Sequence, residues 1–201
     1  MGIIVADMFL TLNGVYQGPG GPEEDPSGGF EFGGWQAPYG DDETGASIME
    51  GIDRLDALLL GRRTYDIWAS YWPVQSESNP IAAKFNAVPK FVASRTLKEP
   101  GWAGTTVIAD PAREVPALKE RFAEIHTIGS GDLVQSLVAA DLVDRLNLLL
   151  YPIAFGTGKR FLESTAPAAF TLVQPARTFP GGAVGLLYER AGVPVTGIEI
   201  T

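Results

Sequence analysis

Short apolar runs of strand length alternate along this chain with segments of helical periodicity, and this alternation limits the fold more than any other feature. Such a succession is typical of an α/β protein whose largely parallel, mixed sheet is flanked by helices. The predicted strands span residues 2–10, 57–60, 89–93, 105–109 and 125–128, and the predicted helices span 42–57, Thr64 to about Pro73, 112–124 and 133–140.

The remaining segments predict a C-terminal hairpin and a long loop after the first strand. At 201 residues, the chain is predicted to form a single domain over residues 1–201. Residues 168–175 and 183–190 are predicted to form an antiparallel hairpin around Pro180-Gly181-Gly182. Residues 15–40 are rich in glycine, proline and acidic side chains, too polar to pack and too long for an ordinary connection, which predicts an active-site loop. The tail 193–201 could add a strand or fray.

Composition excludes several function classes. A net charge of −9 argues against nucleic acid and anionic membrane surfaces as partners. The chain has no cysteine, which excludes disulfides, thiolate nucleophiles and cysteine-ligated zinc, and its single histidine, His126, excludes a multi-histidine metal site. The N-terminus has no basic stretch before Asp7, and no apolar run reaches membrane-spanning length, so we expect a cytoplasmic, metal-free protein.

Three predicted strands end in residues suited to bind anions. Glycine lets a backbone approach a phosphate closely, a helix N-terminus offers free N–H groups, and guanidinium groups clamp phosphate oxygens. At the first of these corners alone, a plain tight turn with solvated arginines explains the residues equally well. Together the three favour a dinucleotide, and the arginines and hydroxyls favour NADP over NAD. The corners comprise Gly61, Arg62, Arg63 and Thr64; Ser94, Arg95 and Thr96; and Gly129, Ser130, Gly131, Asp132 and Leu133.

Five motifs in this order resemble the dihydrofolate reductase superfamily. Within it, the chain is most similar to the reductase domain, the RibD C-terminal domain, of the bifunctional riboflavin-biosynthesis deaminase/reductase and to its stand-alone bacterial relatives. The resemblance spans about residues 3–190. The motifs are Thr11-Leu12-Asn13-Gly14, Leu60–Tyr65, Ser94-Arg95-Thr96, Ile128–Gly131 and Tyr151-Pro152 with Gly156-x-Gly158.

The resemblance implies a dihydrofolate reductase-like fold and an NADP(H) site. It implies that Arg62-Arg63-Thr64 holds the cofactor phosphates, that Ser94-Arg95 lines the 2′-phosphate pocket, and that Gly129–Leu133 lies along the pyrophosphate and nicotinamide. The segment Thr11–Gly14 would border the nicotinamide, and loop 15–40 would be a mobile lid. A homodimer is also compatible with the family.

Two departures argue against folate as the substrate. Dihydrofolate reductases carry a ring-binding acid on the helix before the Gly-Arg corner, but the equivalent position here is near Gly45. They also offer a threonine from a late strand, where this chain has only Leu148-Leu149-Leu150. In addition, Asn13 stands where riboflavin-type reductases often have aspartate.

The sequence assigns no catalytic residue. Hydride transfer needs an aligned, dry pocket more than a protein nucleophile, and the proton could come from water, Tyr151, Glu43 or the substrate itself. His126 is interpreted as a structural histidine. Asn13, Met49 and Leu149 are predicted to lie on the substrate side.

Two functions therefore remain open from the sequence. The first is an NADPH-dependent reductase, an oxidoreductase acting on a small heterocyclic substrate such as a pterin, a pyrimidine or a flavin precursor. The alternative is a catalytically silent nucleotide-binding or interaction module on the same fold, which the missing ring-binding acid favours.

Overall fold

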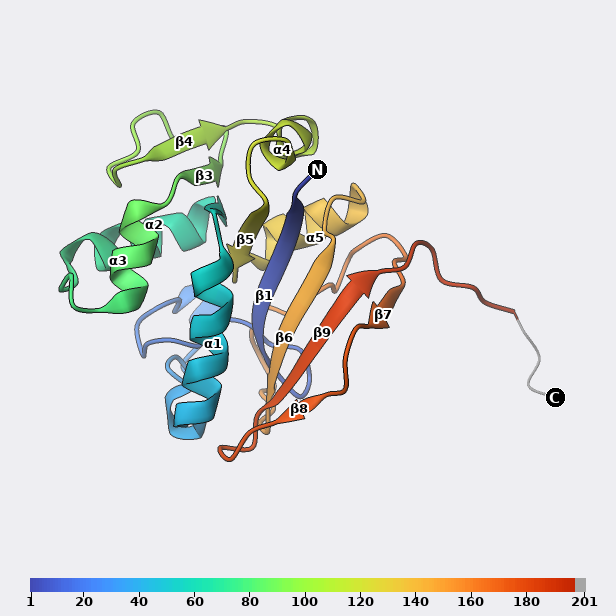
Figure 1. Ribbon diagram of the computed structural model, residues 1–201. Coiled ribbons are helices and arrows are strands. Elements are labelled where there is room, and N and C mark those ends of the chain that lie inside the picture. The colour runs from blue at the N-terminus through green and yellow to red at the C-terminus, as the bar shows by residue number, and fades with distance from the viewer. Residues whose placement is uncertain (198–201) are drawn as a thin grey trace.

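Six parallel strands lie side by side at the centre of the protein and continue into an antiparallel edge (Figure 1). The computed structural model describes residues 1–197, and its sheet has the order β4-β3-β2-β5-β1-β6-β9-β7, with β8 paired to β9. The strands are β1 (Ile3–Thr11), β2 (Ala57–Gly61), β3 (Lys90–Ala93), β4 (Thr105–Ile108), β5 (Glu124–Ile128), β6 (Arg145–Tyr151), β7 (Phe170–Leu172), β8 (Arg177–Thr178) and β9 (Val184–Arg190). The predicted α/β class with a largely parallel, mixed sheet is confirmed.

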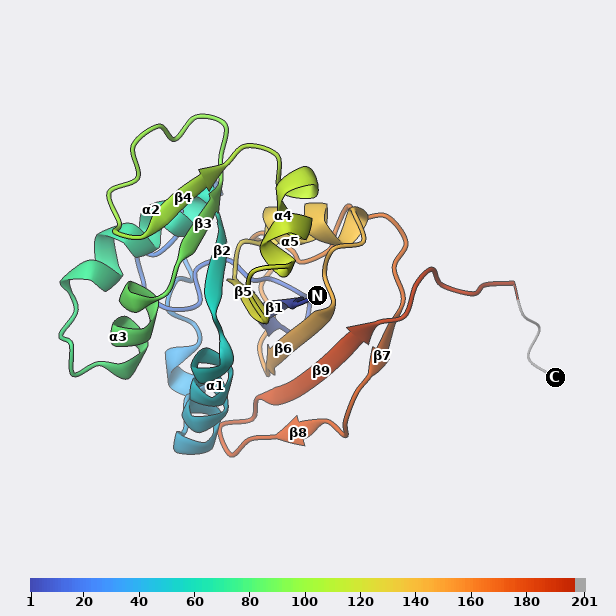
Figure 2. The ribbon, with the colours of Figure 1, turned by 45° about the horizontal axis from the view of Figure 1, so that its top comes forward.

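Helices cover both faces of this sheet (Figure 2). One buried cluster packs α4 and α5 against β1, and a second packs α1, α2 and α3 against β2 and β3. None of these helices, within the part of the chain that the structure describes, is both long and apolar enough to cross a membrane. The helices are α1 (Asp42–Arg54), α2 (Arg62–Tyr71), α3 (Pro80–Ala87), α4 (Pro111–Lys119) and α5 (Gly131–Ala139), with short 3-10 turns η1 (Ser27–Gly29), η2 (Ala37–Tyr39) and η3 (Trp72–Val74).

Helix boundaries differ from the sequence prediction in three places. Helix α1 ends at Arg54, because Leu55 has extended backbone dihedrals and leads into β2. Helix α4 ends at Lys119 rather than near residue 124, where β5 already begins. Thr64 does not cap α2: the helix begins two residues earlier at Arg62, with Gly61 as its N-cap.

Helix α3 has no counterpart among the predicted elements. It buries only Ala82 and Phe85, so its apolar periodicity is weak. Its start is nevertheless encoded, because the Asn79 side chain accepts hydrogen bonds from the N–H groups of Ile81 and Ala82 and Pro80 occupies the first helical position.

The C-terminal strands are antiparallel as predicted, with one strand more than expected. Strand β7 pairs with β9, and the short β8 also pairs with β9. The turn at residues 180–182 therefore joins β8 to β9, not β7 to β9. Residues 193–197 form no strand, and 198–201 lie outside the described residues.

The loop 15–40 is packed more closely than its composition suggests. Val15, Phe30 and Trp35 are buried in a cluster with Tyr151, so the expectation that the loop is too polar to pack is wrong. The indole N–H of Trp35 donates to the carbonyl oxygen of Gln17 at 2.7 Å. These three buried side chains hold the loop against strand β6.

Candidate functional site

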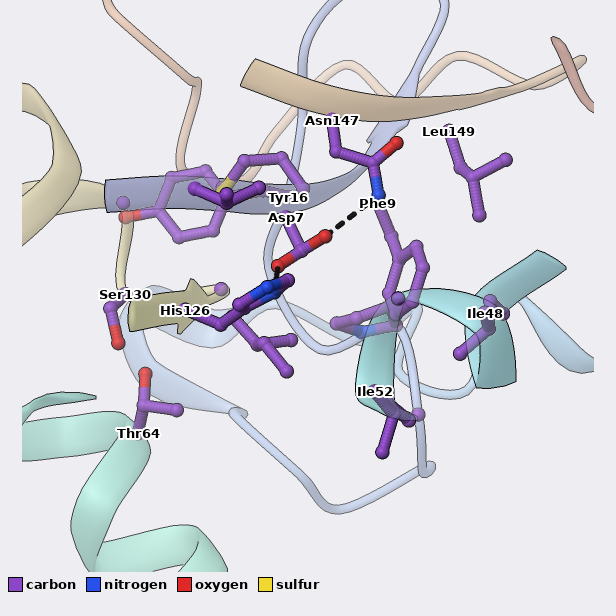
Figure 3. A pocket seen from close by; sticks show the side chains of 18 of the residues that line it. Asp7, Phe9, Tyr16, Ile48, Ile52, Thr64, His126, Ser130, Asn147 and Leu149 are labelled. Carbon is purple, nitrogen blue, oxygen red and sulfur yellow. Dashed lines mark hydrogen bonds and ion pairs between the residues drawn. The ribbon is translucent and has the colours of Figure 1, made fainter. Parts of the chain in front are cut away.

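A cavity of about 1060 Å³ lies between the α1 side of the sheet and loop 15–40 and reaches the carboxyl ends of β2 and β5 (Figure 3). Its roof is formed by residues of the loop, including Tyr16 and Asp25. This volume is at the upper end of the range for small-molecule and cofactor sites. One end of the cavity is rich in anion-binding groups, and the floor is polar within apolar walls.

The anion-binding end is formed by two helix N-termini. Helices α2 and α5 start directly after the neighbouring strands β2 and β5, with Gly61 and Ser130 as their N-caps. No side chain of either N-cap residue accepts a hydrogen bond from the first N–H groups of its helix. Those groups therefore have no capping side chain, although Tyr16 covers the start of α5. The backbone N–H of Gly61 donates to Oγ of Ser130 at 3.0 Å, which ties the two corners together. In Figure 3 the Thr64 hydroxyl points toward Ser130.

The two arginines at this end are held by carboxylates. Nε of Arg62 lies 2.8 Å from both oxygens of Asp66, one turn further along α2. Nη1 of Arg63 lies 3.0 Å from Oδ1 of Asp25, which belongs to loop 15–40. Burial acts to raise the pKa of Asp25, but its bonds to Lys159, Ser27 and Arg63 outweigh it and hold that pKa below the ordinary value. The loop thus places the ionised Asp25 carboxylate against Arg63, one of the residues predicted to bind phosphate.

The second predicted corner, Ser94-Arg95-Thr96, lies beside the first but outside the cavity lining. Ala93, the last residue of β3, pairs in register with Gly61, so Ser94 follows at the same edge of the sheet. Oγ of Ser94 accepts hydrogen bonds from the N–H groups of Thr96 and Leu97, and Arg95 and Thr96 are exposed. Three adjacent parallel strands therefore carry the three corners side by side, with the Ser94 corner outermost.

The glycine corner is covered by a tyrosine of the loop. A Cβ atom on Gly131 would lie 2.3 Å from Cζ of Tyr16, so only glycine allows this contact. Burial raises the pKa of Tyr16 well above its ordinary value, and the Asp132 carboxylate adds to that effect. Asp132 and Leu133 line the same end of the cavity.

A chain of polar side chains crosses the cavity floor on three neighbouring strands. Nδ1 of His126 lies 2.6 Å from Oδ2 of Asp7, and Nε2 lies 2.9 Å from Oε1 of Glu124. Nδ2 of Asn147 donates to the other oxygen of Asp7 at 2.7 Å. The strand register explains this grouping, because Asp7 on β1 is the direct partner of Asn147 on β6.

His126 is almost fully buried, with 1% of its side chain exposed. Burial alone would lower its pKa, but the hydrogen bonds and negative charges of Asp7 and Glu124 raise it above the ordinary 6.5. The imidazole nitrogens face two different carboxylates in two directions, and no group of three metal-ligating side chains is found within residues 1–197. Each ring nitrogen of His126 therefore has a carboxylate partner on the cavity floor.

The cavity walls above this floor are apolar, and they include one of the three residues predicted for the substrate side. Leu149 lines the cavity, whereas Asn13 and Met49 do not. The Asn13 amide donates to the carbonyl oxygen of Phe155, which fixes a turn, and Met49 packs against the cluster beneath α1. The apolar lining nearest the floor consists of Phe9, Ile48, Ile52 and Leu149.

The proton-donor candidates raised by the sequence lie elsewhere. Tyr151 is fully buried and Glu43 lies in the first turn of α1, and neither lines the cavity. Sequence reasoning missed Asp7 and Asn147, although a signal was present. Asp7 interrupts the apolar run of β1, and Asn147 is a polar residue followed by three leucines in β6.

A family model decides the relationship of this chain to known proteins. The model described as "RibD C-terminal domain" matches residues 3–182. The chain belongs to the RibD C-terminal domain family. The resemblance drawn from the five motifs is thereby confirmed.

The chain is also similar to the uncharacterized protein YyaP of Bacillus subtilis (strain 168), with 24% identity over 197 residues, covering 94% of this chain and 95% of YyaP. YyaP is close to this chain in length, and its description names no activity.

Solved structures show the same fold at low identity. A protein of Shewanella sp. PV-4 described as a riboflavin biosynthesis protein has a TM-score of 0.68 at 19% identity, covering 94% of this chain and 99% of its own. A pyrimidine reductase-like protein from Corynebacterium diphtheriae has a TM-score of 0.61 at 13% identity, covering 94% and 92%. Dihydrofolate reductase from Enterococcus faecalis, complexed with NADP(H) and RAB-propyl, has a TM-score of 0.57 at 16% identity, covering 94% and 96%. This RibD C-terminal protein therefore has a dihydrofolate reductase-like fold.

Proposed function

We propose that this protein is an NADPH-dependent reductase of a small heterocyclic substrate. The observation that carries the proposal is the junction of two helix N-termini without capping side chains, α2 and α5, with Arg62 and Arg63 at one end of a cavity that also has apolar wall residues above a polar floor. The first end suits the phosphates of a dinucleotide, and the second suits a flat ring. Reductase-fold relatives, one of them complexed with NADP(H), support the same proposal.

The donor set fits an NADP-like cofactor at named positions. Arg62, Arg63 and Thr64 would hold phosphate groups at the start of α2, and Gly129–Leu133 would lie along the pyrophosphate and nicotinamide at the start of α5. Ser94, Arg95 and Thr96, at the outer strand end, would receive the 2′-phosphate. The cofactor, when bound, supplies the hydride.

The chain itself orients the substrate and excludes water. Phe9, Ile48, Ile52 and Leu149 form apolar walls that would sandwich a ring, and loop 15–40 would cover it as an active-site lid. The apolar walls and the polar floor support a small heterocyclic substrate. We further propose a cytoplasmic location and a homodimer, on the strength of the family alone.

Fluorescence titration with NADPH tests the cofactor half of the proposal. Removal of one charge-assisted phosphate contact costs about 1.5–3 kcal/mol, so Arg63→Ala is expected to weaken NADPH binding about tenfold or more. Arg113→Ala is the matched control, because Arg113 is also an exposed arginine in the first turn of a helix, α4, away from the cavity. Arg95→Ala should weaken NADPH binding more than NADH binding if Arg95 meets the 2′-phosphate.

Turnover separates the reductase from the binding module. NADPH oxidation is followed at 340 nm with a pterin, a pyrimidine and a quinone as acceptors. Consumption of NADPH with any of them excludes the silent module, whereas tight binding without turnover across the panel would favour it. Absence of NADPH binding, together with no effect of Arg62→Ala, would refute the proposed function.

A further inference from the structure

The floor of the cavity carries a stored proton. An ionised carboxylate only accepts hydrogen bonds, and His126 has a carboxylate oxygen at each ring nitrogen, at 2.6 Å and 2.9 Å. Two ionised carboxylates in these positions require both nitrogens to donate, and the ring between Asp7 and Glu124 is then an imidazolium. Such pairing keeps the charged form in a buried position that would otherwise expel it.

Other charged groups lie around the His126 ring on the elements packed against it. From α1, Nε of Arg54 lies 3.4 Å from Oε1 of Glu124, and Glu50 lines the cavity wall. From β6, Arg145 is paired with Glu189. The Asp56 carboxylate accepts the backbone N–H of Glu124.

Asp7 connects the stored proton to the cavity. Both residues line the cavity, but the Asp7 side chain is 13% exposed against 1% for His126, so the carboxylate is the more accessible of the two groups. Asn147 holds the second carboxylate oxygen at 2.7 Å, which fixes the plane of the group. Figure 3 shows Asp7 between His126 and Asn147, facing the space walled by Phe9 and Leu149.

We propose that Asp7 is the proton donor for the reduction, that His126 is the positioning residue that reloads it, and that the substrate carries a C=N bond whose nitrogen meets Asp7. This inference rests on the proposed function and names its substrate class. The proposed proton donor lies on the central strand β1 and not on helix α1.

One proton accompanies the hydride in the proposed reduction. When the carbon of the C=N bond receives a hydride, the π electron pair moves to nitrogen and forms a new N–H bond with the proton delivered by Asp7. The Asp7 oxygen takes the Nδ1 proton of His126, so the imidazolium becomes neutral imidazole. After product leaves, water entering the cavity restores the proton through Asp7. The amine product has gained one hydride and one proton.

Histidine NMR tests the stored proton without any substrate. His126 is the single histidine of the chain, so ¹⁵N-histidine labelling gives one imidazole. We expect two protonated ring nitrogens at pH 7, and a lower titration midpoint in Asp7→Asn. A neutral ring at pH 7 in the wild type overturns the proposal, whatever the activity.

Steady-state NADPH oxidation tests proton delivery. The imine probes are 6-methyl-7,8-dihydropterin and 3,4-dihydroisoquinoline, and menadione is the comparison acceptor, since its reduced oxygens take protons from water. Asp7→Asn is expected to lower the ratio of kcat for the imines to kcat for menadione about 100-fold or more, as for loss of a general acid. Equal rates in wild type and Asp7→Asn would overturn the proposal.

Asp144→Asn is the matched control. Asp144 is also a paired carboxylate next to β1, bound to Lys119 and to the N–H of Ile4, but it lies outside the cavity. His126→Gln keeps hydrogen-bonding capacity without a titratable proton, so it should lower kcat at little change in KM and remove the alkaline limb of the pH profile.

The two failures are distinguishable. If wild type binds NADPH and reduces menadione but neither imine, proton delivery by Asp7 is refuted while the reductase stands. If NADPH does not bind at all, the proposed function fails, and the NMR result still decides whether the proton is stored.

Discussion

The hydroxyl of Ser130 accepts a hydrogen bond from the backbone N–H of Gly61 at 3.0 Å, and this single contact joins the N-termini of α5 and α2. Ser130 holds a left-handed backbone, with φ 52°, to present its side chain there. A strained conformation at a non-glycine residue indicates that its side chain is needed.

Ser130→Ala should therefore destabilise the protein and weaken NADPH binding together. The Gly61 N–H loses its partner, which costs about 1–2 kcal/mol, and the two corners are free to separate. Ser130→Gly removes the same hydroxyl but relaxes the backbone, so it should be the more stable of the two variants. Urea denaturation and NADPH fluorescence measure both effects. Unchanged NADPH affinity in both variants would show that the contact does not shape the site.

The Asp25 carboxylate competes with a ligand phosphate for Arg63. Asp25 lies on the loop, 3.0 Å from the Arg63 guanidinium, and also pairs with Lys159. Asp25→Asn should strengthen NADPH binding by up to about fivefold, because a partly exposed ion pair is worth about 0.2–1 kcal/mol and its removal frees the guanidinium. Asp141→Asn breaks a comparable pair with Arg190 outside the cavity and should have no effect. Weaker binding in Asp25→Asn would mean that Asp25 anchors the loop instead.

His126 makes stability depend on pH in a defined direction. Its pKa is raised on folding, so the unfolded state binds fewer protons between the unfolded value of about 6.5 and the folded pKa. The stabilisation is complete below about pH 6.5 and is lost as pH rises through the folded pKa. Chemical denaturation from pH 5.5 to 9 should show this decline in the wild type and a flatter profile in His126→Gln. Parallel profiles would contradict a charged His126.

The strand ends could be read from the sequence, but the cavity floor could not. Apolar runs followed by Gly-Arg-Arg-Thr and Gly-Ser-Gly carry local information, and the structure places these two corners on the neighbouring strands β2 and β5. The pairing of Asp7 with Asn147 joins residues 140 apart in sequence, and it depends on the register of β1 against β6. Strand order and register are tertiary properties, so a lone aspartate in an apolar run gives no partner.

The loop shows the same limit in another form. Its glycines and acids predicted a polar excursion, yet Phe30 and Trp35 bury themselves against Tyr151. The average composition of the loop does not reveal that burial of two large apolar side chains, Phe30 and Trp35, determines where the loop packs.

Tyr16 and Gly131 form a close contact at the start of α5. The tyrosine ring lies where a Cβ on Gly131 would be, at 2.3 Å from Cζ, and so covers the start of α5. Gly131→Ala must displace Tyr16, which should cost about 1–3 kcal/mol of stability as overpacking does.

A double-mutant cycle separates this steric effect from helix propensity. Tyr16→Ala leaves space for the new methyl group, so Gly131→Ala should be nearly neutral, or slightly stabilising, in the Tyr16→Ala background. The interaction free energy from urea denaturation of the four proteins should then be about 1 kcal/mol or more. Tyr16→Ala should also uncover the N–H groups of α5 and strengthen NADPH binding. Additive effects on stability would show that the tyrosine does not rest on the glycine in solution.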